Sequence, residues 1–99
     1  MLHIVNKSHT QTSALASCLR FAKDGHALLL TEDAVYAATA AGAGGSGLAA
    51  AVERLQVHVL QPDVEARGMA GKLIDGVRCV GYDGFVDLVA EHSTNQSWL

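Results

Sequence analysis

The clearest pattern of hydrophobic and polar positions lies at residues 26–33, His-Ala-Leu-Leu-Leu-Thr-Glu-Asp. Ala27 to Leu30 is apolar at every position and too short for an ordinary globular helix, which is typical of a strand covered on both faces. The turn-forming pair Asp24-Gly25 precedes this run. The polar Thr31-Glu32-Asp33 follows it, and Asp33 can cap a following helix. We therefore expect residues 27–30 to form the central strand of a small α/β domain.

Strands and helices alternate along the rest of the chain. The expected strands are 2–6, 27–30, 57–60 and 77–82, and the expected helices are 12–23, 34–41, 48–54, 64–67 and 84–91, with a further helical turn at 69–73. This alternation favours a single small three-layer α/β domain over residues 1–99, with a mostly parallel sheet of four to five strands, helices on both faces and a flavodoxin-like arrangement. Asp83 is expected to cap the last helix, and the glycine-rich segment 40–47 to be a flexible loop.

The composition is unusually apolar for a chain of this length. Hydrophobic residues make up 49% of the 99 residues and charged residues only 17%, and the mean hydropathy is +0.21. A small domain has little interior, so this excess predicts a subunit interface. The net charge is −3 and the basic residues are scattered, which argues against direct nucleic-acid binding.

The amino-terminal sequence and the two cysteines bear on the cellular compartment of the chain. The amino terminus lacks the basic and long apolar regions of a signal peptide, and no apolar stretch reaches membrane-spanning length. Cys18 and Cys79 show no metal-binding spacing and no close pairing, so a cytoplasmic chain with reduced thiols is expected. No cofactor or metal site is indicated.

Cys18 is the candidate catalytic residue. A thiolate at this position could act as a nucleophile, which requires access to the thiol and a lowered pKa. Neither Arg20 nor Lys23 stacks over Cys18 on the expected helix. The alternative is an inert core cysteine, since free cysteine is among the most buried residue types. Cys79, in the middle of a strand, is expected to lie in the core.

Other candidate features have structural explanations that we favour. The glycines at 42, 44 and 47 satisfy a GxGxxG pattern, but a helix precedes them where a nucleotide fingerprint requires a strand. His9 lies in the loop after the first strand, where a ligand could sit, although a solvated loop histidine is simpler. Glu32 and Asp33 are better explained by helix capping than by acid–base chemistry. Trp98 is an anchor either on its own domain or on a partner.

Several stretches together resemble the DsrH/TusB family. They are Met1-Leu2-His3, Asn6-Lys7-Ser8, Leu28 to Leu30 with Glu32-Asp33, Asp63 with Ala66-Arg67-Gly68, Tyr82 with Phe85-Val86-Asp87-Leu88, and Trp98. The resemblance covers nearly the whole chain in order, apart from the glycine-rich segment. A cysteine in the first helix is typical of the DsrH branch, so Cys18 favours that branch over TusB.

The resemblance implies a subunit of a heterohexameric sulfur-relay complex. Its partners would be a DsrE/TusD-like and a DsrF/TusC-like subunit, with a DsrC/TusE-like protein accepting sulfur from the complex. In both branches the principal sulfur-carrying cysteine belongs to a partner subunit. The resemblance gives Cys18 a second role, in which its thiolate attacks a persulfide and carries the sulfane sulfur onward. The DsrH branch serves sulfur oxidation, and the TusB branch serves thiolation of a tRNA wobble uridine.

Two alternatives remain open from the sequence. The chain could be a purely structural assembly subunit in which Cys18 is only packed. It could also be a small-ligand module that uses the strand ends and the segment from Gly42 to Gly47.

Overall fold

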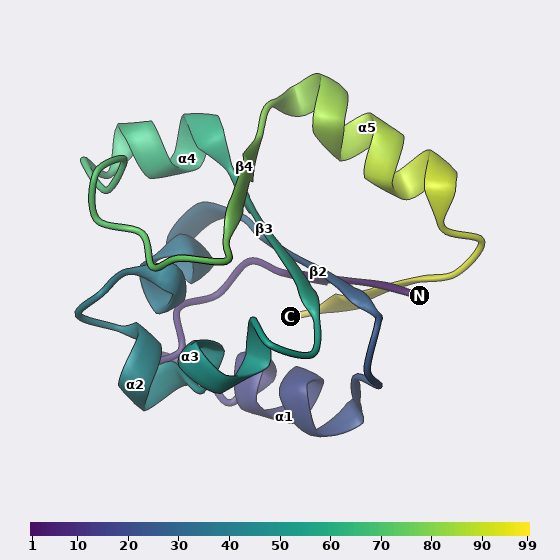
Figure 1. Ribbon diagram of the computed structural model, residues 1–99, viewed down its shortest axis with the longest axis horizontal. Helices are drawn as coiled ribbons and strands as arrows, with labels where there is room; N and C mark the ends of the chain where they lie inside the picture. Colours follow the sequence, from purple (N-terminus) through teal and green to yellow (C-terminus); the bar gives the residue numbers. More distant parts are fainter.

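The computed structural model describes residues 1–99, which form a five-stranded parallel sheet with strand order β4-β3-β2-β1-β5 (Figure 1). The strands are β1 (Leu2–Val5), β2 (Ala27–Leu30), β3 (Gln56–Leu60), β4 (Arg78–Val80) and β5 (Asn95–Trp98). The helices are α1 (Ala14–Phe21), the 3₁₀ helix η1 (Glu32–Ala38), α2 (Ala43–Ser46), α3 (Leu48–Ala51), α4 (Gln61–Ala66) and α5 (Tyr82–Glu91). None of these helices has the length and apolar character needed to cross a membrane.

The predicted central strand is confirmed. β2 lies in the middle of the sheet between β1 and β3, and all four of its side chains have an exposed fraction of 0%. In the register of the sheet, Leu28 lies beside His3 of β1 and Val57 of β3. The continuous apolar run from 27 to 30 therefore reflects burial on both faces.

The direction of the crossovers decides which face each helix covers. From β1 to β4 each new strand is added on the same side of the previous one. Because parallel crossovers are right-handed, the connecting helices α1, η1, α2, α3 and α4 all belong to one face. The chain then returns from β4 across the sheet to β5, which places α5 on the opposite face, as Figure 1 shows for α5 against α1 and α3.

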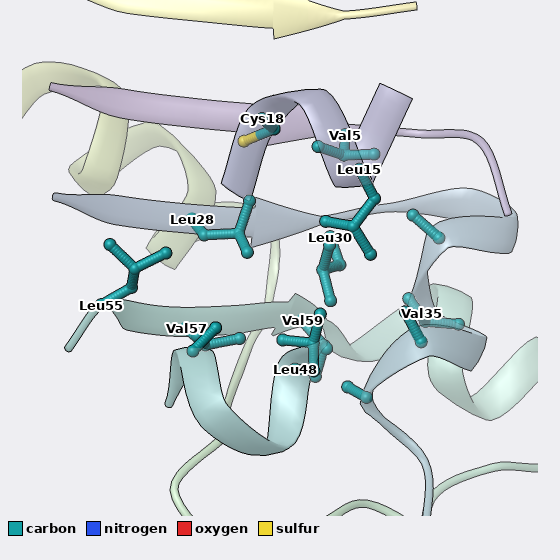
Figure 2. Packing of buried hydrophobic residues seen from close by; sticks show 14 of the residues in the cluster. Val5, Leu15, Cys18, Leu28, Leu30, Val35, Leu48, Leu55, Val57 and Val59 are labelled. Carbon is teal, nitrogen blue, oxygen red and sulfur yellow. The ribbon is translucent and has the colours of Figure 1, made fainter. Parts of the chain in front are cut away.

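The two faces of the sheet have cores of very different size. The larger core contains 17 buried residues, among them Leu28 and Val57 from the strands and Leu15 and Leu48 from the helices (Figure 2). On the face covered by α5, the buried cluster contains only Leu2, Ala27, Leu29 and Leu88. Helix α5 is thus the sole helical cover of a thin second core.

The carboxy-terminal tail contains a strand that its polar sequence did not predict. Residues 95–98 pair in parallel with β1, with Asn95 beside Leu2 and Trp98 beside Val5. Asn95, Gln96 and Ser97 are exposed, so this edge strand lacks the apolar pattern by which strands are recognised. Strand β4 is shorter than predicted, at three residues.

The helix after β2 differs in type and capping from the prediction. It is a 3₁₀ helix that begins at Glu32 after Thr31, so Asp33 lies inside its first turn and is not the cap. Its buried residues Ala34, Val35, Ala37 and Ala38 recur every three positions, which matches the three residues per turn of a 3₁₀ helix. Similarly, Gly81 is the residue preceding α5, and Asp83 lies in the first turn of that helix.

The glycine-rich segment is not a flexible loop as predicted, because residues 43–46 form α2. The Ser46 hydroxyl is buried and donates to the carbonyl of Ala37 at 2.9 Å. Gly47 ends α2 with a φ of +87°, in the left-handed region. The expected helical turn at 69–73 is a single hydrogen-bonded turn, in which the N–H of Lys72 donates to the carbonyl of Met69 at 3.0 Å, and Leu73 forms an isolated antiparallel bridge with Thr39.

Two alanine substitutions test whether this glycine segment is structured. Gly47→Ala should lower the free energy of unfolding by about 1–2 kcal/mol, because a side chain disfavours positive φ and its Cβ would lie 3.2 Å from Leu19 Cδ1. Gly44→Ala has open space around its Cβ and lies in α2, so it should leave stability unchanged or raise it by up to about 1 kcal/mol. Equal effects in denaturant unfolding would indicate a flexible loop instead.

Candidate functional site

Cys18 lies in the larger core, with no exposed surface. Its position in α1 directs its side chain toward the sheet, near Val5, Leu15 and Leu28 (Figure 2). Burial raises the pKa of the Cys18 thiol to about 12, and the positive charge of Arg54 offsets this only in part. In this fold the thiol is shielded from solvent and its protonated form is favoured, as expected for a cysteine packed in the core.

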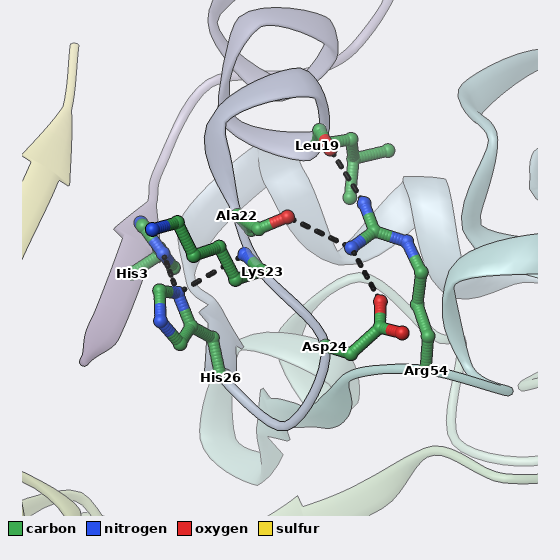
Figure 3. Close-up of polar contacts among 7 residues, drawn as sticks. All are labelled: His3, Leu19, Ala22, Lys23, Asp24, His26 and Arg54. Carbon is green, nitrogen blue, oxygen red and sulfur yellow. Dashed lines mark hydrogen bonds and ion pairs between the residues drawn. The ribbon is translucent and has the colours of Figure 1, made fainter.

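Arg54 is a structural residue that its sequence context did not reveal. Its guanidinium donates to the carbonyl of Leu19 at 2.6 Å and to the carbonyl of Ala22 at 2.8 Å, and it contacts the Asp24 carboxylate at 3.4 Å (Figure 3). The last carbonyls of a helix have no partner within the helix, and a cation is favourable there. Arg54 thereby joins the end of α1 to the segment before β3.

Cys79 is exposed, which contradicts its predicted place in the core. It lies on β4, an edge strand of the sheet. Its register partner Val59 on β3 is fully buried in the larger core, so the two side chains share a face. The helices that cover Val59 do not extend over the edge strand, and sequence alone does not reveal which strand is at an edge.

Trp98 packs on its own domain through a chain of hydrogen bonds. Its Nε1 donates to His3 Nδ1 at 3.1 Å, and His3 Nε2 lies 3.0 Å from His26 Nδ1. The backbone N–H of Lys23 also donates to His26 Nδ1 at 3.3 Å (Figure 3). The ring of Trp98 lies 5.8 Å from that of Phe21, which is within the range of favourable aromatic contacts.

This arrangement requires both histidines to be neutral. His3 Nδ1 accepts from Trp98, so the proton of His3 is assigned to Nε2, which donates to His26. A proton on either Nδ1 would place two donors against each other. Burial, the largest effect, lowers the pKa of His3, and the nearby His26 and amino terminus lower it further. The pKa values of His26 and His58 are lowered as well, again chiefly by burial.

Polar side chains meet at the carboxyl ends of the strands, where α/β sheets commonly bind ligands. Arg67 Nε donates to Asp33 at 2.9 Å, and Asp63 accepts from the backbone N–H of Glu32 at 2.7 Å. Glu32 has a φ of +50°, which is uncommon for a residue with a side chain. Asp63 thus stabilises the backbone conformation of Glu32. The Asp33 carboxylate is likewise paired, with Arg67, so its contacts here are structural.

Two open polar hollows flank the loop after β1. One, of about 350 Å³, is lined by Ser8, His9, Thr10, Gln11, Asp33 and Tyr36. The other, of about 430 Å³, shares His9 to Gln11 and extends to Ser46. His9 Nδ1 is buried without a hydrogen-bond partner. The lining lacks the apolar walls of a typical small-molecule pocket and contains no Cys, Lys or Arg side chain.

The remaining candidates do not form a site either. The segment from Gly42 to Gly47 follows a 3₁₀ helix and forms α2, which is not the strand–turn–helix context of a dinucleotide site. No group of three or more His, Cys, Asp or Glu side chains is arranged to hold a metal ion. What the prediction missed is an exposed apolar strip on α5, formed by Tyr82, Val86 and Val89.

Comparison with known proteins agrees with this description of a small α/β domain. A family model described as DsrH like protein matches residues 7–95. The TusB protein of Klebsiella pneumoniae (strain 342) is 39% identical over 99% of this chain and 100% of its own length. TusB of Pectobacterium parmentieri is 38% identical with the same coverage of both chains. The chain belongs to the DsrH family.

Solved structures share the fold at lower sequence identity. The ychN protein from E. coli superposes with a TM-score of 0.81, at 18% identity, covering 98% of this chain and 97% of that one. The MTH1491 protein from Methanobacterium thermoautotrophicum superposes with a TM-score of 0.70, at 17% identity, over 97% of this chain and 95% of that one. These likenesses confirm the fold class.

The two cysteines should differ sharply in reactivity. In the native protein at pH 8, a thiol reagent such as iodoacetamide should label Cys79, whereas Cys18 should be labelled only after denaturation, because its thiol is buried and its pKa is raised to about 12. Peptide mass spectrometry identifies the labelled residue. Rapid labelling of native Cys18 would contradict its burial.

The histidine network predicts that stability falls in mild acid. His3, His26 and His58 have pKa values below the usual 6.5 in the folded chain, so the unfolded chain binds more protons as pH falls through 6.5. The free energy of unfolding should therefore decrease from pH 7.5 to 5.5, a range above most carboxylate titrations. His3→Gln should be less stable at pH 7.5 but less sensitive to pH. Constant stability in wild type over this range would refute the prediction.

Proposed function

We propose that this chain is a structural subunit of a sulfur-relay complex that serves 2-thiolation of a tRNA wobble uridine. The observation that carries this proposal is similarity to TusB proteins over 99% of the chain, at 39% and 38% identity. That similarity extends along the whole molecule, whereas Cys18 is the one residue of the sequence that favours the sulfur-oxidising branch.

In this role the chain assembles with a TusC-like and a TusD-like subunit in the cytoplasm, where its two free thiols stay reduced. A sulfur carrier must expose a thiolate that attacks the sulfane sulfur of a persulfide. With a pKa of about 12, Cys18 would be a thiolate in only on the order of 10⁻⁴ to 10⁻⁵ of molecules near neutral pH. The carrier cysteine therefore belongs to a partner, and this chain contributes to assembly.

A complementation experiment tests both parts of the proposal. In a strain that lacks this subunit, the wild-type chain should restore 2-thiouridine in tRNA, measured by mass spectrometry of nucleosides. Cys18→Val keeps the site apolar and should restore it equally, as should Cys79→Ser. Failure of the wild type would contradict the pathway. Failure of Cys18→Val alone, with a folded protein at normal abundance, would mean that Cys18 carries sulfur.

A further inference from the structure

Helix α5 has more apolar surface than its own fold uses. Phe85 and Leu88 point inward and pack on the thin second core. Tyr82, Val86 and Val89 remain exposed, at 63%, 66% and 38% respectively. Their spacing of four and three residues aligns them along one side of the helix. We call these three residues the α5 strip.

Negative charge lies along one side of the strip. Asp83 and Asp87 are exposed on the same helix and each follows a strip residue by one position, about 100° around the helix axis. Glu91 is also exposed, but it lies nine positions after Tyr82 and therefore on the opposite side of the helix. All seven Lys and Arg residues of the chain lie at or before Arg78, together with seven of the ten acidic residues. The net charge of −3 therefore belongs entirely to residues 79–99.

These charges distinguish between two possible binding partners for the α5 strip, a second copy of this chain and a different protein. If a second copy of this chain packed strip against strip, symmetry would bring Asp83 and Asp87 of each copy close to those of the other, and like charges across an interface are unfavourable. A partner with Lys or Arg around an apolar surface would gain both apolar burial and charge attraction. An aromatic residue such as Tyr82 is a frequent anchor in such interfaces.

We infer that the α5 strip is the surface by which this chain docks onto a different subunit, one that presents an apolar face bordered by basic residues. This inference rests on the proposed function, in which that subunit is the TusC-like or the TusD-like protein. The chain's apolar excess, with a mean hydropathy of +0.21, is consistent with surface that becomes buried on assembly.

Binding of the purified chain to the TusC-like and TusD-like subunits of the same organism tests this inference. Val86→Glu should weaken binding about tenfold or more, since it places a charge in the apolar strip. Asp83→Lys with Asp87→Lys should weaken binding and reduce its dependence on salt. The matched control is Glu53→Lys with Glu65→Lys, which makes the same charge change at exposed positions outside α5, and it should bind like wild type.

The binding results distinguish a failure of the proposed function from a failure of the α5 strip as the interface. Normal wild-type binding that all three variants retain would overturn the α5 strip as the interface while leaving the proposed function intact. Absence of wild-type binding to either subunit would overturn both. Analytical ultracentrifugation of the chain alone covers the remaining case, because a dimer that Val86→Glu dissociates would show that a second copy occupies the strip. Circular dichroism of each variant confirms that it is folded.

Discussion

The complete burial of β2 is the constraint on which the rest of this structure depends. A strand with four apolar side chains and no exposed surface requires a neighbour on each edge and a covering layer on each face. Successive right-handed crossovers from β1 to β4 place five helices on one face. Only the return connection to β5 can cover the other face, and that task falls to α5.

This asymmetry has consequences for function. The well-covered face has a large core, and Cys18 lies inside it with its thiol neutral. The thinly covered face depends on a single helix that packs through Phe85 and Leu88 while Tyr82 and Val86 stay exposed. The chemistry-bearing side chain is thus enclosed, and the surface most suited to protein contact is open. This distribution fits a subunit that assembles a complex better than one that carries sulfur.

Much of the fold could be predicted from the sequence, because β2, β3 and α1 have clear apolar patterns, and α4 lies between a proline that favours a helix start and a glycine that favours a helix end. β5 could not, since three of its four side chains face solvent and its identity as a strand comes from pairing with β1. The positions of Cys18 and Cys79 also depended on tertiary structure. Each has one polar and one apolar neighbour in sequence, yet Cys18 is buried on the inner side of helix α1 and Cys79 is exposed on an edge strand. Arg54 contacts α1 from more than thirty positions along the chain, which no local pattern predicts.

The most direct test of this account is mass spectrometry of the chain after exposure to a persulfide donor, alone and together with its TusC-like and TusD-like partners. Cys18→Val and Cys79→Ser variants identify the site of any added sulfur. We expect no added sulfur on Cys18 under either condition, while the partner's cysteine becomes loaded. Sulfur that accumulates on Cys18 in the assembled complex, and that is passed onward, would contradict a purely structural role and make this chain a member of the relay.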